Sequence, residues 1–318
     1  MGYEPPFKRT ARIDSLAMEV AEMVGALPAS GLVSNLHLHR ELRIRTIRSS
    51  LMIEGNTLSE NTVTAIIDGK KVLGDADDIR EVENAKRAYD LMNELDPFSL
   101  DDLLRAHRVM MDGLAKEAGS FRSKNAGVFD GDRLIHAGTP ANYVPEVMKD
   151  LFGWMNKTDL HPLLMSCVFH YEFEFVHPFL DGNGRTGRLW HTLLLAHWRP
   201  ALAWLPVESV ILERQQGYYA ALAKSNEEGT CETFVEFMLE VIRDALAPYA
   251  GRASEADLRE EKVLDLLRNN PHMTVTAIAE ATGIPQRTIE RTIANLRKSG
   301  RLVREGSTRA GVWKVGGY

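Results

Sequence analysis

The sequence has few cysteines and no long apolar run, and these two absences exclude several classes of protein. Its two cysteines, Cys167 and Cys231, do not have the spacing of metal ligands. We therefore expect two buried free thiols, without a disulfide framework or a zinc site. No run approaches the roughly 18 apolar residues of a membrane span. The first residues also lack the apolar core of a secretory signal, so we expect a cytoplasmic protein with no membrane anchor.

An excess of positive charge is missing from the chain as a whole. Its formal net charge is −6, which gives no reason to expect nucleic-acid binding by the entire chain. Residues 252–318 differ, because they hold twelve Lys or Arg against eight Asp or Glu, a net charge of +4 that leaves −10 for the rest. The length of 318 residues and the hydrophobic content of 44% predict two domains, or one domain with an appendage.

The most informative stretch of the sequence runs from His177 to Arg188 and reads His-Pro-Phe-Leu-Asp-Gly-Asn-Gly-Arg-Thr-Gly-Arg. The segment before it, residues 163–176, is apolar and free of Pro and Gly, which predicts a buried helix that ends before Pro178. His177 then lies at the mouth of a loop. An imidazole at such a position can take a proton near neutral pH from an approaching hydroxyl.

The residues after this histidine suit a nucleotide triphosphate with its metal ion. Asp181 offers the hard oxygen ligand that Mg²⁺ accepts. Gly182 and Gly184 allow main-chain amides to close on phosphate oxygens, at the start of a helix that we predict from Thr186 to Trp198.

Two arginines complete the phosphate chemistry of this stretch. Arg185 and Arg188 are three residues apart, so their forks project from one side of the predicted helix and can reach one ligand. Taken singly, each residue of the stretch has an ordinary explanation, such as a capping aspartate, a tight turn or a solvated arginine. These explanations do not predict one another, whereas phosphate-group transfer predicts all of the residues in one loop.

The stretch resembles the signature of the Fic family, His-x-Phe-x-Asp/Glu-Gly-Asn-Gly-Arg-x-x-Arg, and matches every specified position. Members of that family mostly transfer AMP from ATP to a Ser, Thr or Tyr hydroxyl of a target protein. The resemblance implies that His177 is the general base and Asp181 the Mg²⁺ ligand. It implies that Asn183 forms an anion hole with the amides of Gly182 and Gly184, and that Arg185 and Arg188 clamp the phosphates. A family branch that phosphorylates departs from Gly-Asn-Gly, so the intact Gly184 favours AMP transfer. The signature leaves rarer transfers of other phosphate-linked groups open.

A carboxylate at the end of a second predicted helix breaks a local rule. Residues 36–53 are free of Pro and Gly, and Gly55 suits the left-handed position after a helix. Glu54 therefore lies at the negative end of the helix dipole, where an anion is penalised by roughly 0.3–1 kcal/mol. A solvated glutamate would need no further explanation. However, Ser50 to Gly55 resembles the Fic inhibitory motif Ser/Thr-x-x-x-Glu-Gly/Asn, which implies that Glu54 pairs with Arg188 and misaligns ATP.

The chain between these two motifs changes its period. Residues 101–117 predict a helix, and residues 128–135 then predict a short hairpin around Asp130-Gly131. The hairpin could be a plain connector. In Fic proteins, a hairpin flap at this place aligns the target segment by strand pairing, which implies Ile135 and His136 as flap residues.

After the signature, residues 213–225 predict a helix that carries Tyr218 and Tyr219 and is followed by Asn226. Tyrosines in a helix are more often core than ligand contacts. Because Fic proteins have a similar Tyr-Tyr pair and a downstream Asn beside the nucleotide, the resemblance places Tyr219 and Asn226 near the adenosine.

The C-terminal segment resembles a winged helix-turn-helix domain. We predict three helices and a strand pair, at residues 260–269, 275–282, 285–298, 301–305 and 311–315. In the third helix, the apolar side chains predict a buried face formed by Ile289, Ile293 and Leu296. The polar side chains predict an outward face formed by Gln286, Arg287, Glu290 and Arg291. Such domains bind DNA or serve in docking and dimerisation, and an acidic Glu290 on the outward face weakens the electrostatic case for DNA.

These observations predict a mainly α protein with a Fic-type helical bundle, a small β-hairpin flap and a C-terminal winged helix. We expect an N-terminal helical region at 1–100, a catalytic domain at 101–250 and the winged helix at 251–318. The leading hypothesis is an ATP- and Mg²⁺-dependent adenylyltransferase, autoinhibited by Glu54, that modifies a target protein or itself. The alternatives are a DNA-binding regulator whose Fic domain senses nucleotide without transfer, and an enzyme that removes AMP. A homodimer is left open.

Overall fold

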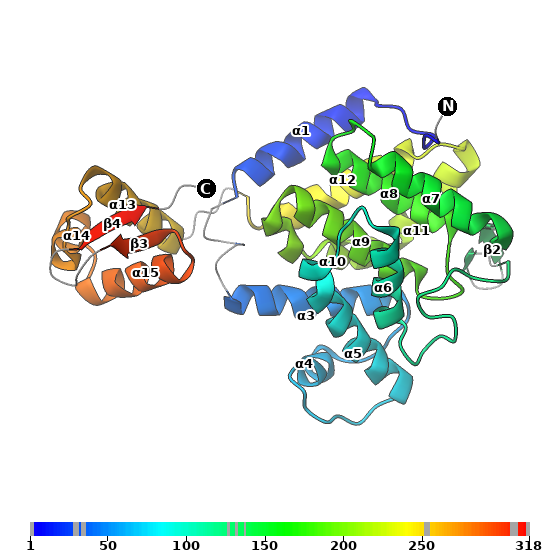
Figure 1. Cartoon of the computed structure of the whole chain (residues 1–318), viewed down its shortest axis with the longest axis horizontal. Coiled ribbons are helices and arrows are strands. Elements are labelled where there is room, and N and C mark those ends of the chain that lie inside the picture. The colour runs from blue at the N-terminus through cyan, green and yellow to red at the C-terminus, as the bar shows by residue number, and fades with distance from the viewer. Residues whose placement is uncertain are drawn as a thin grey trace. The chain divides into compact units, whose positions relative to one another are not determined.

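The computed structural model describes residues 3–27, 32, 36–125, 128–130, 133–136, 138–250, 255–305 and 311–315. The chain divides into two compact units (Figure 1). Unit 1 comprises Met1–Gly25 with His37–Pro248, and unit 2 comprises Ala26–Leu36 with Tyr249–Tyr318. The predicted mainly α fold is confirmed.

Unit 1 is built from α-helices, three short 3-10 helices and one hairpin. Its helices are α1 (Ala11–Gly25), α3 (Leu36–Ile53), α4 (Glu60–Ile67), α5 (Ala76–Asp90), α6 (Leu100–Met110), α7 (Val144–Met155), α8 (Pro162–Val176), α9 (Asn183–Trp198), α10 (Val207–Glu213), α11 (Gln215–Glu228) and α12 (Glu232–Leu246). The 3-10 helices are η1 (Leu91–Glu94), η2 (Ala141–Tyr143) and η3 (Pro200–Trp204). The hairpin consists of β1 (Val128–Asp130) and β2 (Arg133–His136), which pair antiparallel.

Helices α8 and α9 form the centre of unit 1 (Figure 1). The predicted buried helix is confirmed in α8, where only Pro162 and Phe175 are even partly exposed. His161 caps α8 by accepting the N–H of Leu163, and Pro162 occupies the first helical position, where its missing N–H costs nothing. One apolar cluster joins side chains of α3 to α9 around this pair. The loop between α8 and α9 is therefore supported by well-packed helices on both sides.

The N-terminal helix α1 covers α12. Its buried side chains, Ile13, Leu16, Val20 and Val24, recur at helical spacing and form an apolar stripe. The amide of Cys231, the residue before α12, donates to the carbonyl of Pro6. Both Cys167 and Cys231 are free and buried, as the sequence predicts.

Several predicted boundaries differ from the structure. The helix predicted at 101–117 ends at Met110, because Gly113 and Gly119 have φ of +71° and +78°, which end helical geometry. Helix α9 begins at Asn183, three residues earlier than predicted. Asn226 lies inside α11 instead of after it. The hairpin is confirmed, but Asp130 lies within β1 and pairs with Arg133.

Unit 2 contains a winged helix-turn-helix domain, as predicted. Its elements are α13 (Glu255–Asn269), α14 (Val275–Thr282), α15 (Gln286–Lys298), β3 (Leu302–Glu305) and β4 (Val312–Val315). The side chains predicted to face its core, Ile289, Ile293 and Leu296, are buried. The four polar side chains predicted to face outward are exposed. Among all the residues described, no helix has the length and apolar character of a membrane span.

Candidate active site

The candidate site begins where α8 ends. His177 caps this helix in the left-handed conformation, with φ 51° and ψ 63°, and is the one non-glycine residue of the described chain with positive φ. This conformation costs a residue with a Cβ about 1–2 kcal/mol. Strain of this kind persists only where the surroundings impose it and is concentrated at functional sites. The imidazole is half-buried.

Asn183 fixes the shape of the loop that follows. Its side-chain amide donates to the carbonyl of Phe179 and its amide oxygen accepts the N–H of Phe179, both at 2.8 Å. The predicted anion-hole residue thus uses its side chain to position the loop. The first main-chain bond of α9 runs from Thr186 to Gly182. The amides of residues 183–185 consequently point out of the helix N-terminus, where an anion is favoured.

Arg188 is paired with groups at the end of α3, more than a hundred residues earlier in the chain. Its guanidinium is 1% exposed and donates to the Glu54 carboxylate at 2.8 Å, the Ser50 carbonyl at 2.9 Å and the Ser50 hydroxyl at 3.1 Å. Burial alone would lower the pKa of Arg188, but Glu54, Tyr218 and Glu174 together outweigh burial and the pKa is raised. A Cβ on Gly184 would lie 2.3 Å from the Glu54 carboxylate. This glycine therefore permits the close approach of Glu54 to Arg188.

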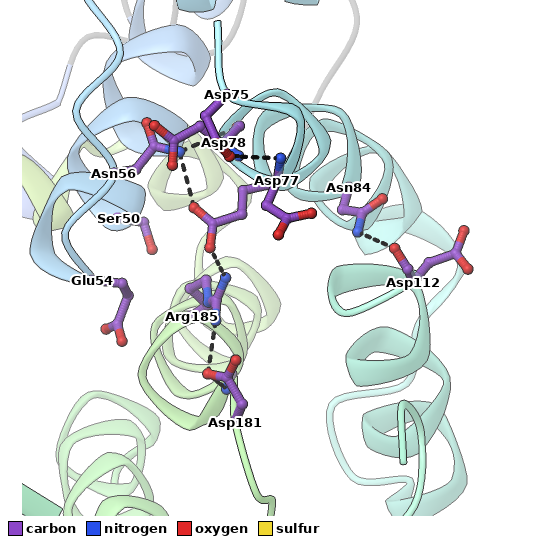
Figure 2. Close-up of polar contacts among 12 residues, drawn as sticks. Ser50, Glu54, Asn56, Asp75, Asp77, Asp78, Asn84, Asp112, Asp181 and Arg185 are labelled. Atoms are coloured by element: carbon purple, nitrogen blue, oxygen red, sulfur yellow. Dashed lines mark hydrogen bonds and ion pairs between the residues drawn. The ribbon is translucent and has the colours of Figure 1, made fainter. Parts of the chain in front are cut away.

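Arg185 is held by two other carboxylates (Figure 2). It donates to Glu81 at 2.6 Å and to Asp181 at 2.8 Å. The side-chain amide of Asn56, two residues after Glu54, donates to the second oxygen of Glu81 at 2.9 Å. The two signature arginines, which were predicted to reach one ligand, thus contact different carboxylates. These come from the turn after α3, from α5 and from the loop between α8 and α9 (the catalytic loop, residues 177–182).

Asp181 has the exposure and chemistry of a Mg²⁺ ligand. Its side chain is 59% exposed. One of its oxygens accepts Arg185 and the Gly182 amide, and no donor of the described residues contacts the other oxygen. No cluster of three or more metal-ligating side chains is present in this described part of the chain. Mg²⁺ is usually held by one or two carboxylates together with substrate phosphates, and Asp181 could hold it in this way.

Two of the residues that sequence reasoning missed support the loop from α5 and α6. Glu81 is one of them. The other is His107 of α6, which stacks on Phe179 at 3.6 Å between ring centroids and contacts the Asp181 carbonyl at 3.0 Å. Both lie some 70 to 100 positions before the signature, and no local pattern around them signals their role.

The predicted adenosine contacts lie on α11. Asn226 accepts a hydrogen bond from the Tyr171 hydroxyl at 2.9 Å. Tyr219 is 42% exposed. Burial raises the pKa of Tyr219, and the charge of the Glu54 carboxylate raises it further. Of the predicted flap residues, Ile135 and His136 both belong to β2, but their side chains lie outside the described part of the structure.

The sequence matches two family models, and the fold matches that of a solved structure. The Fic/DOC family model matches residues 97–195, and a model described as winged helix-turn-helix DNA-binding matches residues 257–303. The crystal structure of a Fic family protein from Desulfovibrio desulfuricans G20 is 39% identical, with a TM-score of 0.75 and 99% of each chain covered.

Two curated relatives are named protein adenylyltransferases. Protein adenylyltransferase fic-1 of Caenorhabditis elegans is 31% identical over 227 residues, which are 67% of this chain and 42% of that protein. Protein adenylyltransferase Fic of Nematostella vectensis is 25% identical over 260 residues, 78% of this chain and 58% of that protein. The chain thus spans about half the length of the curated relatives it matches.

Proposed function

Because this chain belongs to the Fic/DOC family, we propose that it transfers AMP from ATP to a hydroxyl side chain of a target protein and is held inactive by Glu54. The observation that carries this proposal is the ion pair between Glu54 and Arg188. A signature arginine that is 1% exposed is committed to a carboxylate from another helix. This is the arrangement expected of a phosphate clamp that is blocked until needed.

In the proposed reaction, the oxygen of the target hydroxyl attacks the α-phosphorus of ATP. His177 takes the hydroxyl proton, a bond forms from the target oxygen to the α-phosphorus, and the bond to the β-phosphate oxygen breaks, so that pyrophosphate leaves. The amides of residues 183–185 would receive phosphate oxygens at the N-terminus of α9. Asp181 would hold Mg²⁺, which neutralises phosphate charge when bound.

Autoinhibition follows from competition for one guanidinium. Arg188 cannot serve the Glu54 carboxylate and the γ-phosphate together, and a fixed anion at this point also repels the triphosphate. ATP would then bind in a pose that does not align its α-phosphate with His177. Because charge-assisted hydrogen bonds contribute about 1.5–3 kcal/mol each, freeing Arg188 would raise transfer by roughly tenfold or more.

The test is label transfer from α-³²P-labelled ATP, with Mg²⁺ and a cell lysate, by four proteins: wild type, Glu54→Gly, Glu54→Gln and Glu54→Gly/His177→Ala. We expect the strongest labelling with Glu54→Gly. Glu54→Gln, which removes the charge but keeps the shape, should be intermediate, and loss of His177 should abolish labelling. Equal labelling by wild type and Glu54→Gly would contradict autoinhibition.

The same assay separates two alternative functions. A nucleotide-sensing domain that transfers nothing would give no label with any variant. An enzyme that removes AMP would instead strip label from proteins already modified by Glu54→Gly, and wild type would do so faster than Glu54→Gln.

A second proposed function, DNA binding, is favoured by the charge of the winged helix. Arg259, Arg287 and Arg291 line a cleft of about 440 Å³ between α13 and α15, and none of the three forms an ion pair with any residue that the structure describes. Glu290, which weakened the case for DNA, is hydrogen-bonded to Gln286 at 3.0 Å. Fluorescence anisotropy with a duplex at rising salt tests this function, because phosphate contacts predict a steep loss of affinity.

A further inference from the structure

Arg122 lies beneath the catalytic loop and has no role in the chemistry proposed above. Its residue surface is 2% exposed. The guanidinium donates to four main-chain carbonyls: His177 at 2.7 Å, Lys124 at 3.0 Å, Val176 at 3.3 Å, and Thr139. No carboxylate of the described residues pairs with it, so its acceptors belong entirely to the backbone.

Two of these carbonyls belong to the strained end of α8. The last carbonyls of a helix have no partner within it and carry partial negative charge, so a cation is favoured there. Arg122 supplies that cation to Val176 and His177, and its own main-chain N–H donates to the carbonyl of Pro178 at 3.0 Å. Three consecutive residues around the proposed base are thereby tied to one arginine.

The other two carbonyls belong to the chain on either side of the β1–β2 hairpin. Lys124 precedes the hairpin and Thr139 follows it. The two sides are joined again by the amide of Ala141, which donates to the side-chain oxygen of Asn125 at 2.9 Å. The Thr139 amide also donates to the Val176 carbonyl at 3.4 Å. Arg122 is therefore the point at which the base of the hairpin meets the end of α8.

We propose that Arg122 is a positioning residue that fixes the general base and the hairpin in one frame, so that a target segment paired with the hairpin presents its hydroxyl to His177. This rests on the proposed transfer function. An arginine suits the role because its planar fork donates in several fixed directions at once. A lysine has one nitrogen and cannot span carbonyls on both sides of the hairpin and at the helix end.

The test compares Arg122→Lys and Arg122→Gln in the Glu54→Gly background, using α-³²P-labelled ATP and a cell lysate. We expect the maximal labelling rate to fall about 100-fold for Gln, because misplacing reacting groups by about 1 Å costs that much, and less for Lys. The Kd for ATP, measured by calorimetry, should change less than about twofold, since Arg122 contacts no proposed phosphate ligand. A Gln variant that labels at the parental rate would overturn the proposal.

A matched control separates positioning from loss of stability. Met148→Ala opens a cavity at a fully buried side chain of α7, a helix whose described residues have no hydrogen bond to Arg122. If this variant lowers the melting temperature as much as Arg122→Gln and labelling falls equally in both, the role of Arg122 is merely structural and the proposal fails.

Hydrogen exchange on the full chain gives a readout that needs no activity. Arg122→Gln should speed exchange at the Thr139 and His177 amides, and Met148→Ala should not. Unchanged exchange there would contradict the proposal even if transfer were lost. An inactive Glu54→Gly parent would instead count against the proposed function and leave the exchange test in place.

Discussion

His107 shows how a single neutral residue can support the catalytic loop. Its Nδ1 accepts the Gly119 N–H at 2.9 Å, so its Nε2 carries the hydrogen and donates to the Asp181 carbonyl at 3.0 Å. Burial lowers the pKa of His107 to about 4, against the opposing effect of the Asp181 carbonyl. The unfolded chain, with a histidine pKa of about 6.5, therefore binds more protons between pH 6.5 and 4, and the stability that neutral His107 contributes is lost as the pH falls through that window.

We predict that His107→Phe, which keeps the ring stacked on Phe179, lowers the melting temperature most at pH 7 and least near pH 4.5. At pH 7 the variant leaves the Gly119 amide and the Asp181 carbonyl without their partner, at about 1–3 kcal/mol for each buried group. Burial also lowers the pKa values of His170 and His191. Both histidines are present in wild type and in the variant, so their effects cancel in the difference in melting temperature. A difference in circular-dichroism melting temperature that is constant with pH would contradict this prediction.

The residues of the site divide into those that sequence could predict and those it could not. The signature could be predicted because its chemistry lies in one contiguous segment, and Glu54 because Ser50 to Gly55 resembles the Fic inhibitory motif. Glu81, His107 and Arg122 act through contacts that exist only once α5, α6 and the segment after α6 have packed against the loop. Nothing in their local sequence distinguishes them from a surface glutamate, a core histidine or a loop arginine.

At the scale of elements, Asn56 joins the C-terminal end of α3, two residues after Glu54, to α5. The Asn56 side chain is 6% exposed and donates to the Asp78 carbonyl at 3.2 Å as well as to Glu81. Its own amide returns to the Leu51 carbonyl at 3.1 Å. Asn56 thus anchors the C-terminal end of α3 to α5, the helix whose Glu81 pairs with Arg185 (Figure 2).

We predict that Asn56→Ala partly relieves inhibition and raises labelling about fivefold, less than Glu54→Gly does, because one hydrogen bond to a charged group is lost. Asn84→Ala is the matched control. Asn84 is a buried amide on the same helix α5, and its side chain donates to the Asp112 carbonyl at 2.8 Å instead of to Glu81. Both variants should lose stability, and only Asn56→Ala should gain activity. Equal activity in the two would refute the anchoring role.

There is also a physical reason why some helices could be predicted from the sequence and others could not. Helices α3, α8 and α9 follow from long stretches without Pro and, in α3 and α8, without Gly. Helix α5 was missed because it is dominated by charge, and α4 because it spans only Glu60–Ile67. Residues 111–117 were wrongly predicted as helical because the pattern of apolar residues outweighed Gly113, whose left-handed conformation ends the helix.

At the scale of the whole molecule, the proposed functions lie in different units. Unit 1 holds the signature and the inhibitory motif, and unit 2 holds the cleft lined by arginines. The charge of the chain is divided in the same way, with +4 in residues 252–318 and −10 elsewhere. We therefore expect changes in one unit to leave the function of the other intact.

We predict that Arg287→Glu/Arg291→Glu strongly weakens duplex binding and leaves transfer by the Glu54→Gly protein unchanged, while Glu54→Gly alone leaves duplex affinity unchanged. Each lost phosphate contact should reduce the slope of log affinity against log salt by about one. The control, Lys262→Glu/Arg268→Glu, reverses the same charge on α13 outside the cleft and should weaken binding only slightly. Anisotropy and label transfer are measured on four full-length proteins: wild type, Glu54→Gly, and the two charge-reversed variants in the Glu54→Gly background. Equal loss of affinity in the two charge-reversed variants would mean that net charge, and not the cleft, attracts the duplex.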